Sequence, residues 1–569
     1  MPQRRHLLSL LPGLLLAGCQ PKPDADTSPG DVDTAPVVDG DGDGWGTGDD
    51  CDDADAAINP GMVETCNGVD DDCNDAIDEV GDLDGDGENA TACMSGTDCD
   101  DGDPTIHAGA EETCDDGIDQ DCNGVDARCG YSGYSGSVQV GADAKFFGIG
   151  TDCDAGRMLD TFDLTGDGVE DLIIPTLYAN SNAGGAYVVP GATTGLGGSH
   201  GLSTAGFHIS GTYPETFGAG RAVGGADVNG DGFGDLLIGS PWYDEAPTTW
   251  ITFGPITADA DVMSADVALV GEFYTWAGHG ADISDLTGDG IGDAVVGAYM
   301  DHGEGFYAGT AYIVNGPLSA GRRTLESSWD AKIDATGTHS HFGRFLRAGG
   351  DVSGDGIGDF LIAAPEDNTS AALAGSVYVF HGPVTGSITT ANADGSWYGE
   401  RPNSTLGTSG VGFGDIDGDG VSDALMGADP DDAETGAAYV AFGPASGVHS
   451  VDAAGIILRG TRAGMHFGSD VAGGDTDGAG ADDLLVGAHF AVGGYGDTGA
   501  AYLFTDLTSG SYTADDADAA FWGETSGDFL GFGVALGDLD GDNHDEVILG
   551  APYQDTGGRS GGAVYVQWP

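Results

Sequence analysis

One acidic loop recurs seven times in the chain and constrains its fold more than any other feature. In the clearest copy, DIDGDGVSD, Asp415, Asp417, Asp419 and Asp423 stand at loop positions 1, 3, 5 and 9. The intervening glycines allow the positive φ angles that a tight turn needs. Carboxylates this close repel one another unless a cation lies among them, and an all-oxygen set at this spacing suits Ca²⁺. The loop therefore predicts a calcium site.

The other six copies keep the same positions, with their first residues 58 to 66 positions apart. Four copies have Thr, Asn or Ser at position 3, one has Ala479 at position 5, and the last has Glu at position 9. Their predicted calcium ligands are Asp163, Thr165, Asp167 and Asp171; Asp227, Asn229, Asp231 and Asp235; Asp285, Thr287, Asp289 and Asp293; Asp351, Ser353, Asp355 and Asp359; Asp475, Asp477 and Asp483; and Asp538, Asp540, Asp542 and Glu546.

The charge of the chain excludes some classes of partner. The formal net charge is −79, with only 16 Lys and Arg residues. Phosphate binding needs a basic face, so this balance excludes nucleic acid and argues against docking on anionic lipid. The 104 glycines, interspersed with short segments rich in Val, Ile, Leu and Tyr, favour turn-rich β structure over disorder.

Residues 1–18 have the layout of a secretory signal, with two arginines ahead of an apolar run. The run is too short to span a membrane. It ends in LAGC, which resembles a bacterial lipobox and implies cleavage before Cys19 and lipidation of that residue. Gln20 resembles the signal of lipoproteins sent to an outer membrane, so we expect an exported, lipid-anchored protein at the outer membrane or surface of a bacterium. The alternative is ordinary secretion. Residues 19–38 are predicted to form an unfolded tether.

Residues 39–130 form a second predicted module, with 30 Asp and Glu against a single Arg and with eight of the ten cysteines. The module contains one Cys-rich pattern twice, and an aspartate ladder precedes each copy: Asp39, Asp41 and Asp43, then Asp82, Asp84 and Asp86. Because this segment is highly charged, it cannot bury a useful hydrophobic core. Disulfides and bound ions would have to hold it together. The pattern resembles the Asp/Cys-rich metal-binding repeat of bacterial surface proteins, some of which are linked to copper.

Three metals are candidates for this module. Calcium on the aspartate ladders is favoured, and copper is implied only by the resemblance. Zinc held by thiolates is the rival interpretation, but the module has no CxxC pair and exported cysteines are usually oxidised. Removal of Cys19 leaves nine cysteines, so one is free or pairs outside the module, and Cys153 is a candidate partner for Cys129. The connectivity stays open.

From about residue 131 each repeat has the same order of elements. A glycine pair comes first, then the Asp loop, an apolar strand such as LLIGSP or FLIAAP, a variable loop, and a third strand such as AGTAYIV. A fourth strand is shorter. The aromatic-glycine pairs are Phe147-Gly148, Phe217-Gly218, Phe342-Gly343, Phe467-Gly468 and Phe532-Gly533, and copies three and five depart with Trp276-Ala277-Gly278 and Leu406-Gly407. Such long periodic self-similarity is typical of repeat architectures.

These units resemble FG-GAP repeats, as in the N-terminal β-propeller of integrin α subunits, and they cover residues 131–569. The resemblance implies an all-β chain whose seven repeats form a seven-bladed propeller of four-stranded blades, preceded by the small irregular module of residues 39–130. Residues 136–140 align with a fourth strand. We therefore expect them to complete the last blade and close the ring.

Two functional classes are compatible with these sequence features. The chain has no P-loop and no plausible catalytic triad, and His302, His339 and His341 are interpreted as isolated side chains. The favoured class is a non-enzymatic adhesion or ligand-binding module that binds a surface protein or a glycan. The alternative is an extracellular hydrolase or a polysaccharide lyase, which needs basic residues beside a uronate. Clustering of Arg344, Arg347, Arg401 and Arg462 in one pocket would favour the enzyme, and scattered arginines would favour the binding module.

The partner is expected on the face opposite the Asp loops. Antiparallel strands alternate in direction, so the loops between second and third strands emerge on the other face, and their sequences vary. The candidate partner-binding residues there are aromatic: Trp242, Tyr243, Tyr299, Phe490 and Tyr553. The alternative is that Trp242 and Tyr243 only pack between adjacent blades.

Overall fold

The computed structural model describes residues 39–45, 50–52, 54–62, 69–70, 72–73, 99–100, 103–107, 122, 131, 134–148, 150–179, 183–192, 196–212, 218–242, 246–429, 435–493 and 496–569. Cys19, Asp82, Asp84, Asp86, Cys129 and Tyr243 lie outside these residues. The chain divides into two compact units, residues 1–111 with 120–122, and residues 112–119 with 123–569. Within the described ranges, no helix has both the length and the apolar character that a membrane span requires.

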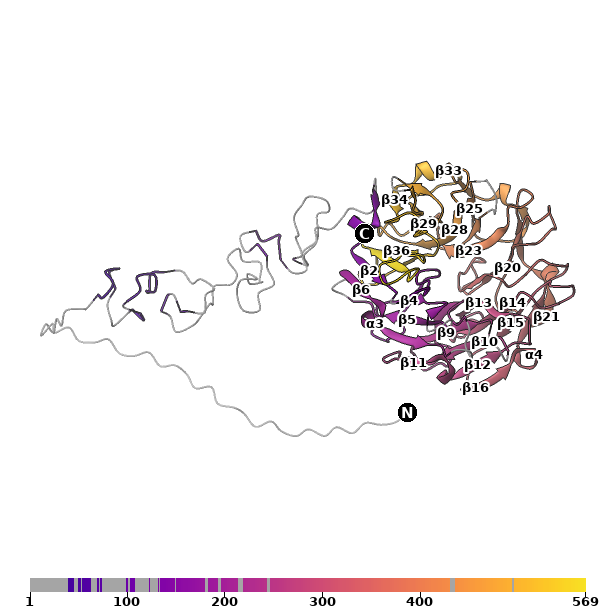
Figure 1. The fold of residues 1–569 in the computed structure, drawn as a ribbon, viewed down its shortest axis with the longest axis horizontal. Coiled ribbons are helices and arrows are strands. Elements are labelled where there is room, and N and C mark those ends of the chain that lie inside the picture. The colour runs from indigo at the N-terminus through magenta and orange to yellow at the C-terminus, as the bar shows by residue number, and fades with distance from the viewer. Residues whose placement is uncertain are drawn as a thin grey trace, which may run out of the picture. The chain divides into compact units, whose positions relative to one another are not determined.

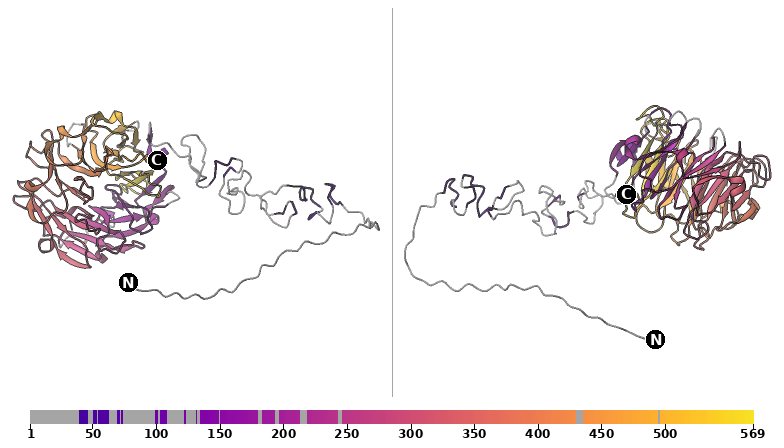
Figure 2. Two further views of the ribbon diagram at one scale, coloured as in Figure 1. Left: turned by 180° about the vertical axis from the view of Figure 1, so that it is seen from behind. Right: turned by 90° about the horizontal axis from the view of Figure 1, so that it is seen from below.

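The larger unit is a β-propeller, and its described residues form seven five-stranded sheets around a central axis (Figure 1). The first strand of each sheet is innermost, because first strands contact one another from blade to blade. Figure 2 shows the same blades from behind and from below. The first strands are β3 (Asp160–Phe162), β8 (Val223–Ala226), β13 (Ala277–Ser284), β18 (Leu346–Ala348), β23 (Leu406–Gly414), β28 (Phe467–Gly474) and β35 (Val534–Gly537).

The second and third strands pair antiparallel with their neighbours and are almost entirely buried, since both faces of each sheet pack against other blades. The second strands are β4 (Asp171–Pro175), β9 (Asp235–Ser240), β14 (Asp293–Ala298), β19 (Phe360–Ala364), β24 (Asp423–Ala428), β29 (Asp483–Ala488) and β36 (Glu546–Ala551). The third strands are β5 (Gly185–Val189), β10 (Thr248–Thr252), β15 (Thr310–Val314), β20 (Ser376–Phe380), β25 (Ala437–Ala441), β32 (Ala500–Phe504) and β37 (Ala563–Gln567).

Each blade has one strand more than the sequence predicted. The fourth strands are β7 (Phe207–Ser210), β12 (Val267–Val270), β17 (Ala331–Asp334), β22 (Gly395–Tyr398), β27 (Ile456–Arg459), β34 (Ala519–Trp522) and β2 (Ala144–Phe147). A short fifth strand from the next repeat pairs parallel with each of them. The fifth strands are β11 (Ala260–Asp261), β16 (Gly321–Thr324), β21 (Gly386–Thr389), β26 (Gly447–Ser450), β33 (Gly510–Thr513), β1 (Ser135–Ser137) and β6 (Gly198–Gly201). These exchanges link neighbouring blades.

The remaining elements are short. A turn of helix lies between the fifth-strand and fourth-strand segments of each repeat: α1 (Val138–Gly141), α3 (Leu202–Ala205), η1 (Val262–Ser264), α4 (Leu325–Ser328), η2 (Thr390–Asn392), η3 (Val451–Ala453) and η4 (Ala514–Asp516). A small hairpin pairs β30 (Val492–Gly493) with β31 (Gly496–Asp497).

The N-terminal part of the propeller closes the ring, but through a different segment from the one predicted. Residues 136–140 do not form the fourth strand of the last blade: they divide between β1, which pairs with β34 of the sixth blade, and α1. The fourth strand of the last blade is β2, which pairs antiparallel with β37. The alignment was wrong because a fifth-strand segment, whose existence was not expected, resembles a fourth strand in composition.

The opening glycine pair also has a different register in three blades. Isolated parallel bridges fix the residue before the glycine in five blades: Ala155↔Gly562, Gly184↔Ala219, Gly375↔Leu406, Gly436↔Phe467 and Gly499↔Leu530. In the first, second and seventh blades the pair is therefore Ala155-Gly156, Ala219-Gly220 and Leu530-Gly531, and all three glycines have positive φ. The phenylalanines nearby were misleading, because this position accepts any small or apolar residue.

Candidate metal loops and ligand-binding face

The Asp loops connect the first and second strands of each blade, as predicted. In the third blade, for example, β13 ends at Ser284 and β14 begins at Asp293. The connections between second and third strands therefore emerge on the opposite side of the ring, which we call the far face. The two faces carry different chemistry.

The position-9 carboxylate of each loop is buried and holds the loop onto its blade. Asp423 is fully buried, and its two oxygens accept hydrogen bonds from the backbone N–H of Ile416 at 2.9 Å and of Gly443 at 2.8 Å. Gly443 lies just beyond the third strand, so one side chain ties together two connections of the blade. The same bond to a glycine beyond the third strand recurs at Gly191, Gly254, Gly316 and Gly382.

The position-1 carboxylate organises the turn itself. Asp163 accepts hydrogen bonds from the backbone N–H of Gly166, Asp167 and Gly168 at 2.7, 3.2 and 2.9 Å. The same pattern recurs at Asp227, Asp285 and Asp351. The glycine at position 4 is required twice over, because Gly166 has φ +77° and an added Cβ would lie 2.6 Å from the Phe233 ring of the next blade.

In two of the seven Asp loops, three carboxylates converge as a hard divalent cation requires. One oxygen from each of Asp415, Asp417 and Asp423 lies within 4.8 Å of the others, and the same holds for Asp538, Asp540 and Asp542. Within the described part of the chain, Asp475 Oδ1 and Glu546 Oε1 are buried without a hydrogen-bond partner. Burial raises the pKa of Asp423 to about 7 and of Glu546 to about 10. Crowded buried carboxylates with unused oxygens are the environment in which a cation supplies the missing interactions.

The Asp loops also connect neighbouring blades. The backbone N–H at position 8 donates to the position-1 carbonyl of the preceding blade, as in Gly292 to Asp227 at 2.6 Å and Asp482 to Asp415 at 2.8 Å. In the fifth and sixth blades this contact is doubled, because the backbone N–H of Asp415 donates to the Asp482 carboxylate at 2.7 Å. Hydrogen bonds therefore link each of these Asp loops to the loop of a neighbouring blade.

On the far face, the residue after each opening glycine lines the mouth of the central channel. These seven residues are Arg157, Arg221, His279, Arg344, Thr408, Ser469 and Phe532, one from each blade in order. They line a cavity of about 190 Å³. Three arginines and a histidine therefore come from four consecutive blades, which is a local concentration of positive charge in a very acidic chain.

The arginines of this mouth are only partly compensated by acidic groups. Arg157 Nη1 lies 3.4 Å from Asp154 Oδ2, and Arg344 Nη1 lies 3.7 Å from Glu366 Oε1. Among the described residues, no carboxylate forms an ion pair with Arg221, whose Nε donates to His279 Nε2 at 3.0 Å. Burial, together with the neighbouring Arg157 and Arg344, lowers the pKa of Arg221 to about 9. Rings cover the guanidinium groups: Arg157 lies 4.5 Å from the centroid of Phe532, and Arg221 lies 5.5 Å from that of Phe345.

The four described residues of the predicted partner site all lie around this mouth. Tyr553 Oη accepts from Arg157 at 3.3 Å, and Phe490 and Tyr553 both contact Phe529. Tyr299, however, is only 6% exposed, packed against His279 and Arg344. Trp242 of the second blade contacts Trp276 and His279 of the third. The expectation of exposed aromatics is therefore wrong for Tyr299, and Trp242 packs between blades, as the alternative proposed.

Several residues of the far face were not predicted from the sequence. Arg157 and Arg221 could have been found, because each follows the opening glycine of its repeat once the pair is in the right register. Among the described residues, the exposed aromatics of this face belong instead to the third blade, where Phe273, Tyr274 and Phe306 are 52%, 76% and 52% exposed. They lie in the connections on either side of β13 and β14.

The four arginines whose clustering would favour an enzyme lie in different places. Arg344 and Arg347 line the same cavity, together with Arg157 and Arg221. Arg401 is paired with Glu400, and Arg462 lines a separate depression beside Thr461 and Trp522. Arg347 lies 3.1 Å from Asp160 and 3.9 Å from Asp282, so its charge is compensated inside the channel. Neither complete clustering nor complete scattering is observed.

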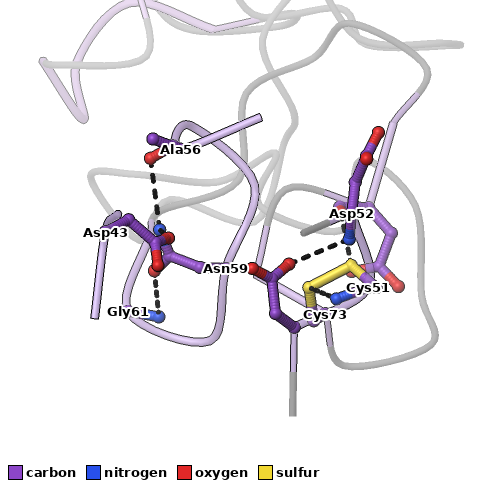
Figure 3. Close-up of a disulfide and its surroundings, with 9 residues drawn as sticks. Asp43, Cys51, Asp52, Ala56, Asn59, Gly61 and Cys73 are labelled. Carbon is purple, nitrogen blue, oxygen red and sulfur yellow. Dashed lines mark hydrogen bonds between the residues drawn. A yellow bond between two sulfur atoms is a disulfide. The ribbon is translucent and has the colours of Figure 1, made fainter. Parts of the chain in front are cut away.

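The described part of the N-terminal unit consists of turns held by two disulfides, Cys51–Cys73 and Cys99–Cys122. Figure 3 shows the first of these disulfides and its surroundings. Nearby, the side-chain amide of Asn59 donates a hydrogen bond to the Asp43 carboxylate at 2.6 Å. One oxygen from each of Asp39, Asp41 and Asp43 lies within 4.8 Å of the others, and the buried Asp41 Oδ2 has no hydrogen-bond partner among the described residues. This ladder therefore also fits a cation. Disulfides of this kind are typical of proteins outside the cytosol.

Both parts of the chain match known families over limited stretches. Residues 219–251 and 530–566 match the FG-GAP repeat, and their starts coincide with the observed register at Ala219 and Leu530. Residues 50–79 and 98–127 match a MopE-type copper-binding family described as a "putative metal-binding motif".

The curated relatives include integrins and an enzyme. Integrin alpha-PS2 of Drosophila melanogaster is 34% identical over 173 residues, which cover 28% of this chain and 11% of that protein. Integrin alpha-V of Gallus gallus is 26% identical over 215 residues, which cover 37% and 20%. Phosphatidylinositol-glycan-specific phospholipase D of Rattus norvegicus is 30% identical over 206 residues, which cover 33% and 24%. The chain thus spans less than a quarter of the length of each of these relatives.

These matches and the geometry agree on the architecture. In this chain the Asp loops lie on one side of the ring and the variable connections on the other. The chain carries FG-GAP repeats in a seven-bladed propeller similar to that of integrin α subunits, preceded by two MopE-type motifs.

Proposed function

We propose that the propeller is a non-enzymatic adhesion module that binds a carboxylate-bearing ligand, on a surface protein or a glycan, at the mouth of its far face. The observation that carries this proposal is Arg221, which is half-buried among other cations with no ion-pair partner in the described chain. A guanidinium in this state gains more from an incoming anion than a solvated one, because its desolvation cost is already met. The integrin relatives are consistent with a binding role.

The chemistry of the surroundings favours an acidic ligand over a neutral one. Arg157, Arg221 and Arg344 converge on one cavity, and aromatic rings beside them restrict their rotamers. Arg forms paired hydrogen bonds with carboxylates in a fixed geometry, and prior restriction lowers the entropy cost of binding. The exposed Phe273, Tyr274 and Phe306 would then contact the less polar part of the ligand.

The proposal is tested with the full mature chain on arrays of uronate-bearing glycans and of acidic peptides. We expect Arg221→Gln to weaken binding by about tenfold or more, since hydrogen bonds between charged groups contribute about 1.5–3 kcal/mol. Arg401→Gln is the matched control, because Arg401 lies outside the cavity and its side chain is 53% exposed. Equal affinities for the two variants would contradict the proposal. A hit on only one of the arrays identifies the source of the carboxylate.

We further propose that the ions of the Asp loops are Ca²⁺. The loops offer carboxylate, hydroxyl and amide oxygens at regular spacing, without a nitrogen or sulfur ligand in the predicted sets, and calcium accepts six to eight such oxygens. Asp39, Asp41 and Asp43 offer the same chemistry, whereas copper in the N-terminal unit is supported only by the MopE-type match.

A second candidate function is a hydrolase or a lyase acting on acidic polysaccharide. It is favoured by Asp470, which lines the same cavity as the arginines and whose pKa is raised to about 7 by burial, as a general base requires. The same arrays distinguish the two functions. Release of an unsaturated or shortened product, abolished in Asp470→Asn, would establish the enzyme, and binding without any product supports the adhesion module.

The lipid anchor is also a proposal, since Cys19 lies outside the described residues. We expect Cys19→Ser to give a protein that carries no acyl label and is either unprocessed or released from membranes. A single acyl chain retains a protein only marginally, so stable anchoring requires more than one. Fractionation of labelled cells checks this. Substituted protein that still partitions with membranes as the native protein does would refute the lipobox interpretation.

A further inference from the structure

Asp429, His466 and His489 meet on the far face where the fifth and sixth blades adjoin. Asp429 directly follows β24, and His489 directly follows β29. His466 directly precedes β28. Three separate connections therefore bring these side chains together, although 60 residues separate the first from the last along the chain. None of them belongs to an Asp loop.

The three side chains have the geometry of a metal-binding set. His466 Nδ1 lies 2.5 Å from Asp429 Oδ1, and the imidazole centroids of His466 and His489 are 5.1 Å apart. One donor atom from each residue lies within 4.8 Å of the others. His466 adopts the left-handed backbone conformation, with φ +56°.

An independent observation points to a ligand at this place. His489 is only 7% exposed, and its buried Nδ1 has no hydrogen-bond partner among the residues that the structure describes. Its ring lies among Phe490, Phe529 and Phe532, with centroid distances of 4.5, 6.3 and 4.9 Å. A buried polar nitrogen without a partner costs about 1–3 kcal/mol. If packing alone were needed, an apolar residue would serve better at this position.

The set is not a general consequence of the repeat. At the junction of the third and fourth blades the corresponding positions hold Tyr299, His341 and Pro365. His341 Nδ1 lies 3.0 Å from Glu366, and neither Tyr299 nor Pro365 supplies a second imidazole. The same backbone thus exists without the two-histidine set, which gives a matched control within the molecule.

We propose that Asp429, His466 and His489 bind one divalent transition-metal ion. Two imidazole nitrogens and a carboxylate oxygen suit Zn²⁺, Cu²⁺ or Ni²⁺, whereas Ca²⁺ and Mg²⁺ prefer oxygen ligands alone. Two His and one carboxylate also match a zinc set that keeps a coordination position open for water or a further ligand. The site lies on the far face and shares no residue with the Asp loops or with the arginine-lined cavity.

Cobalt and zinc test the site directly. The full chain, without a polyhistidine tag, is freed of metals and held in excess Ca²⁺ to saturate oxygen sites, and is then titrated with Co²⁺ or Zn²⁺. We expect the native protein to bind one equivalent more than the double variant His466→Asn/His489→Phe. Visible absorption of the bound Co²⁺, typical of nitrogen coordination at low coordination number, should disappear in that variant. Zn²⁺ should raise the melting temperature of the native protein only.

The variants are chosen to separate metal binding from folding. Asn tolerates the left-handed conformation of residue 466, and Phe at 489 matches its aromatic surroundings. We therefore expect the double variant to melt no lower than the native protein when no metal is present. His341→Asn is the control for a histidine at the equivalent position and should keep the additional equivalent. Equal Co²⁺ stoichiometry and spectra for the native protein and the double variant would overturn the proposal.

Discussion

Removal of calcium is expected to lower the melting temperature of the propeller by at least about 10 °C. Extracellular calcium sites have dissociation constants of about 10⁻⁴–10⁻³ M. At ten to a hundred times such a constant, an ion that binds only the folded state stabilises it by about 1.4–2.7 kcal/mol per site. The stabilisation from the seven loops adds up, and the position-8 backbone hydrogen bonds couple neighbouring blades. Even at the small temperature shift per kcal/mol of a large domain, the sum is substantial.

The measurement is a thermal melt with chelator, with Ca²⁺ restored, and with Mg²⁺ in its place. Only Ca²⁺ should restore the native melting temperature, because Mg²⁺ keeps its own water and demands a smaller octahedral site. Unchanged melting after chelation would show that the loops are held by hydrogen bonds alone. The loop of Asp475 should be the last to fill, because Ala479 supplies no side-chain oxygen at position 5.

The loss on chelation should also depend on pH. In the calcium-free protein, burial raises the pKa of Asp423 to about 7 and that of Asp235 to about 6, above the value near 4 of exposed carboxyls. Between these values the folded state binds more protons than the unfolded state. Stability of the calcium-free protein therefore falls as pH rises from about 4 to 7. The difference between calcium-loaded and calcium-free protein should be larger at pH 8 than at pH 5.

The fold was predictable from sequence because its signals are local and repeated. The Asp loops, the apolar second strands and the third strands with their tyrosines each recur in one order, so seven blades follow from counting. The fifth strands were not predictable in the same way. Segments such as Gly386–Thr389 are short and polar, and they acquire strand structure only by pairing with β17 of the preceding blade. The closing segment was misplaced for the same reason.

The candidate sites depend on contacts between repeats, which no single repeat reveals. Arg157 and Arg221 follow alanine–glycine pairs and carry no motif, and their importance appears only when consecutive blades place them in one ring. Asp429, His466 and His489 likewise come from two repeats. Tyr299 shows the opposite error. Its place in a variable loop suggested exposure, but Tyr299 directly follows β14 and packs against His279 and Arg344.

The position-9 residues are expected to matter even when no calcium is bound. Asp423→Ala removes the acceptor of two buried backbone donors, those of Ile416 and Gly443. Each buried donor left without a partner costs about 1–3 kcal/mol, so the free energy of unfolding should fall by about 2–6 kcal/mol. Asp423→Asn should lose less, since its amide oxygen still accepts one of these bonds.

Asp419→Ala is the matched control in the same loop. Asp419 is exposed, and its side chain accepts a hydrogen bond from the backbone N–H of Val421 at 3.0 Å. With Ca²⁺ present, both alanine variants should melt below the native protein, because both lose a ligand. With chelator, Asp419→Ala should melt close to the native protein, whereas Asp423→Ala should still melt several degrees lower. If the two variants behave alike in chelator, the position-9 carboxylate acts only through the ion, and the hydrogen bonds to Ile416 and Gly443 contribute nothing of their own.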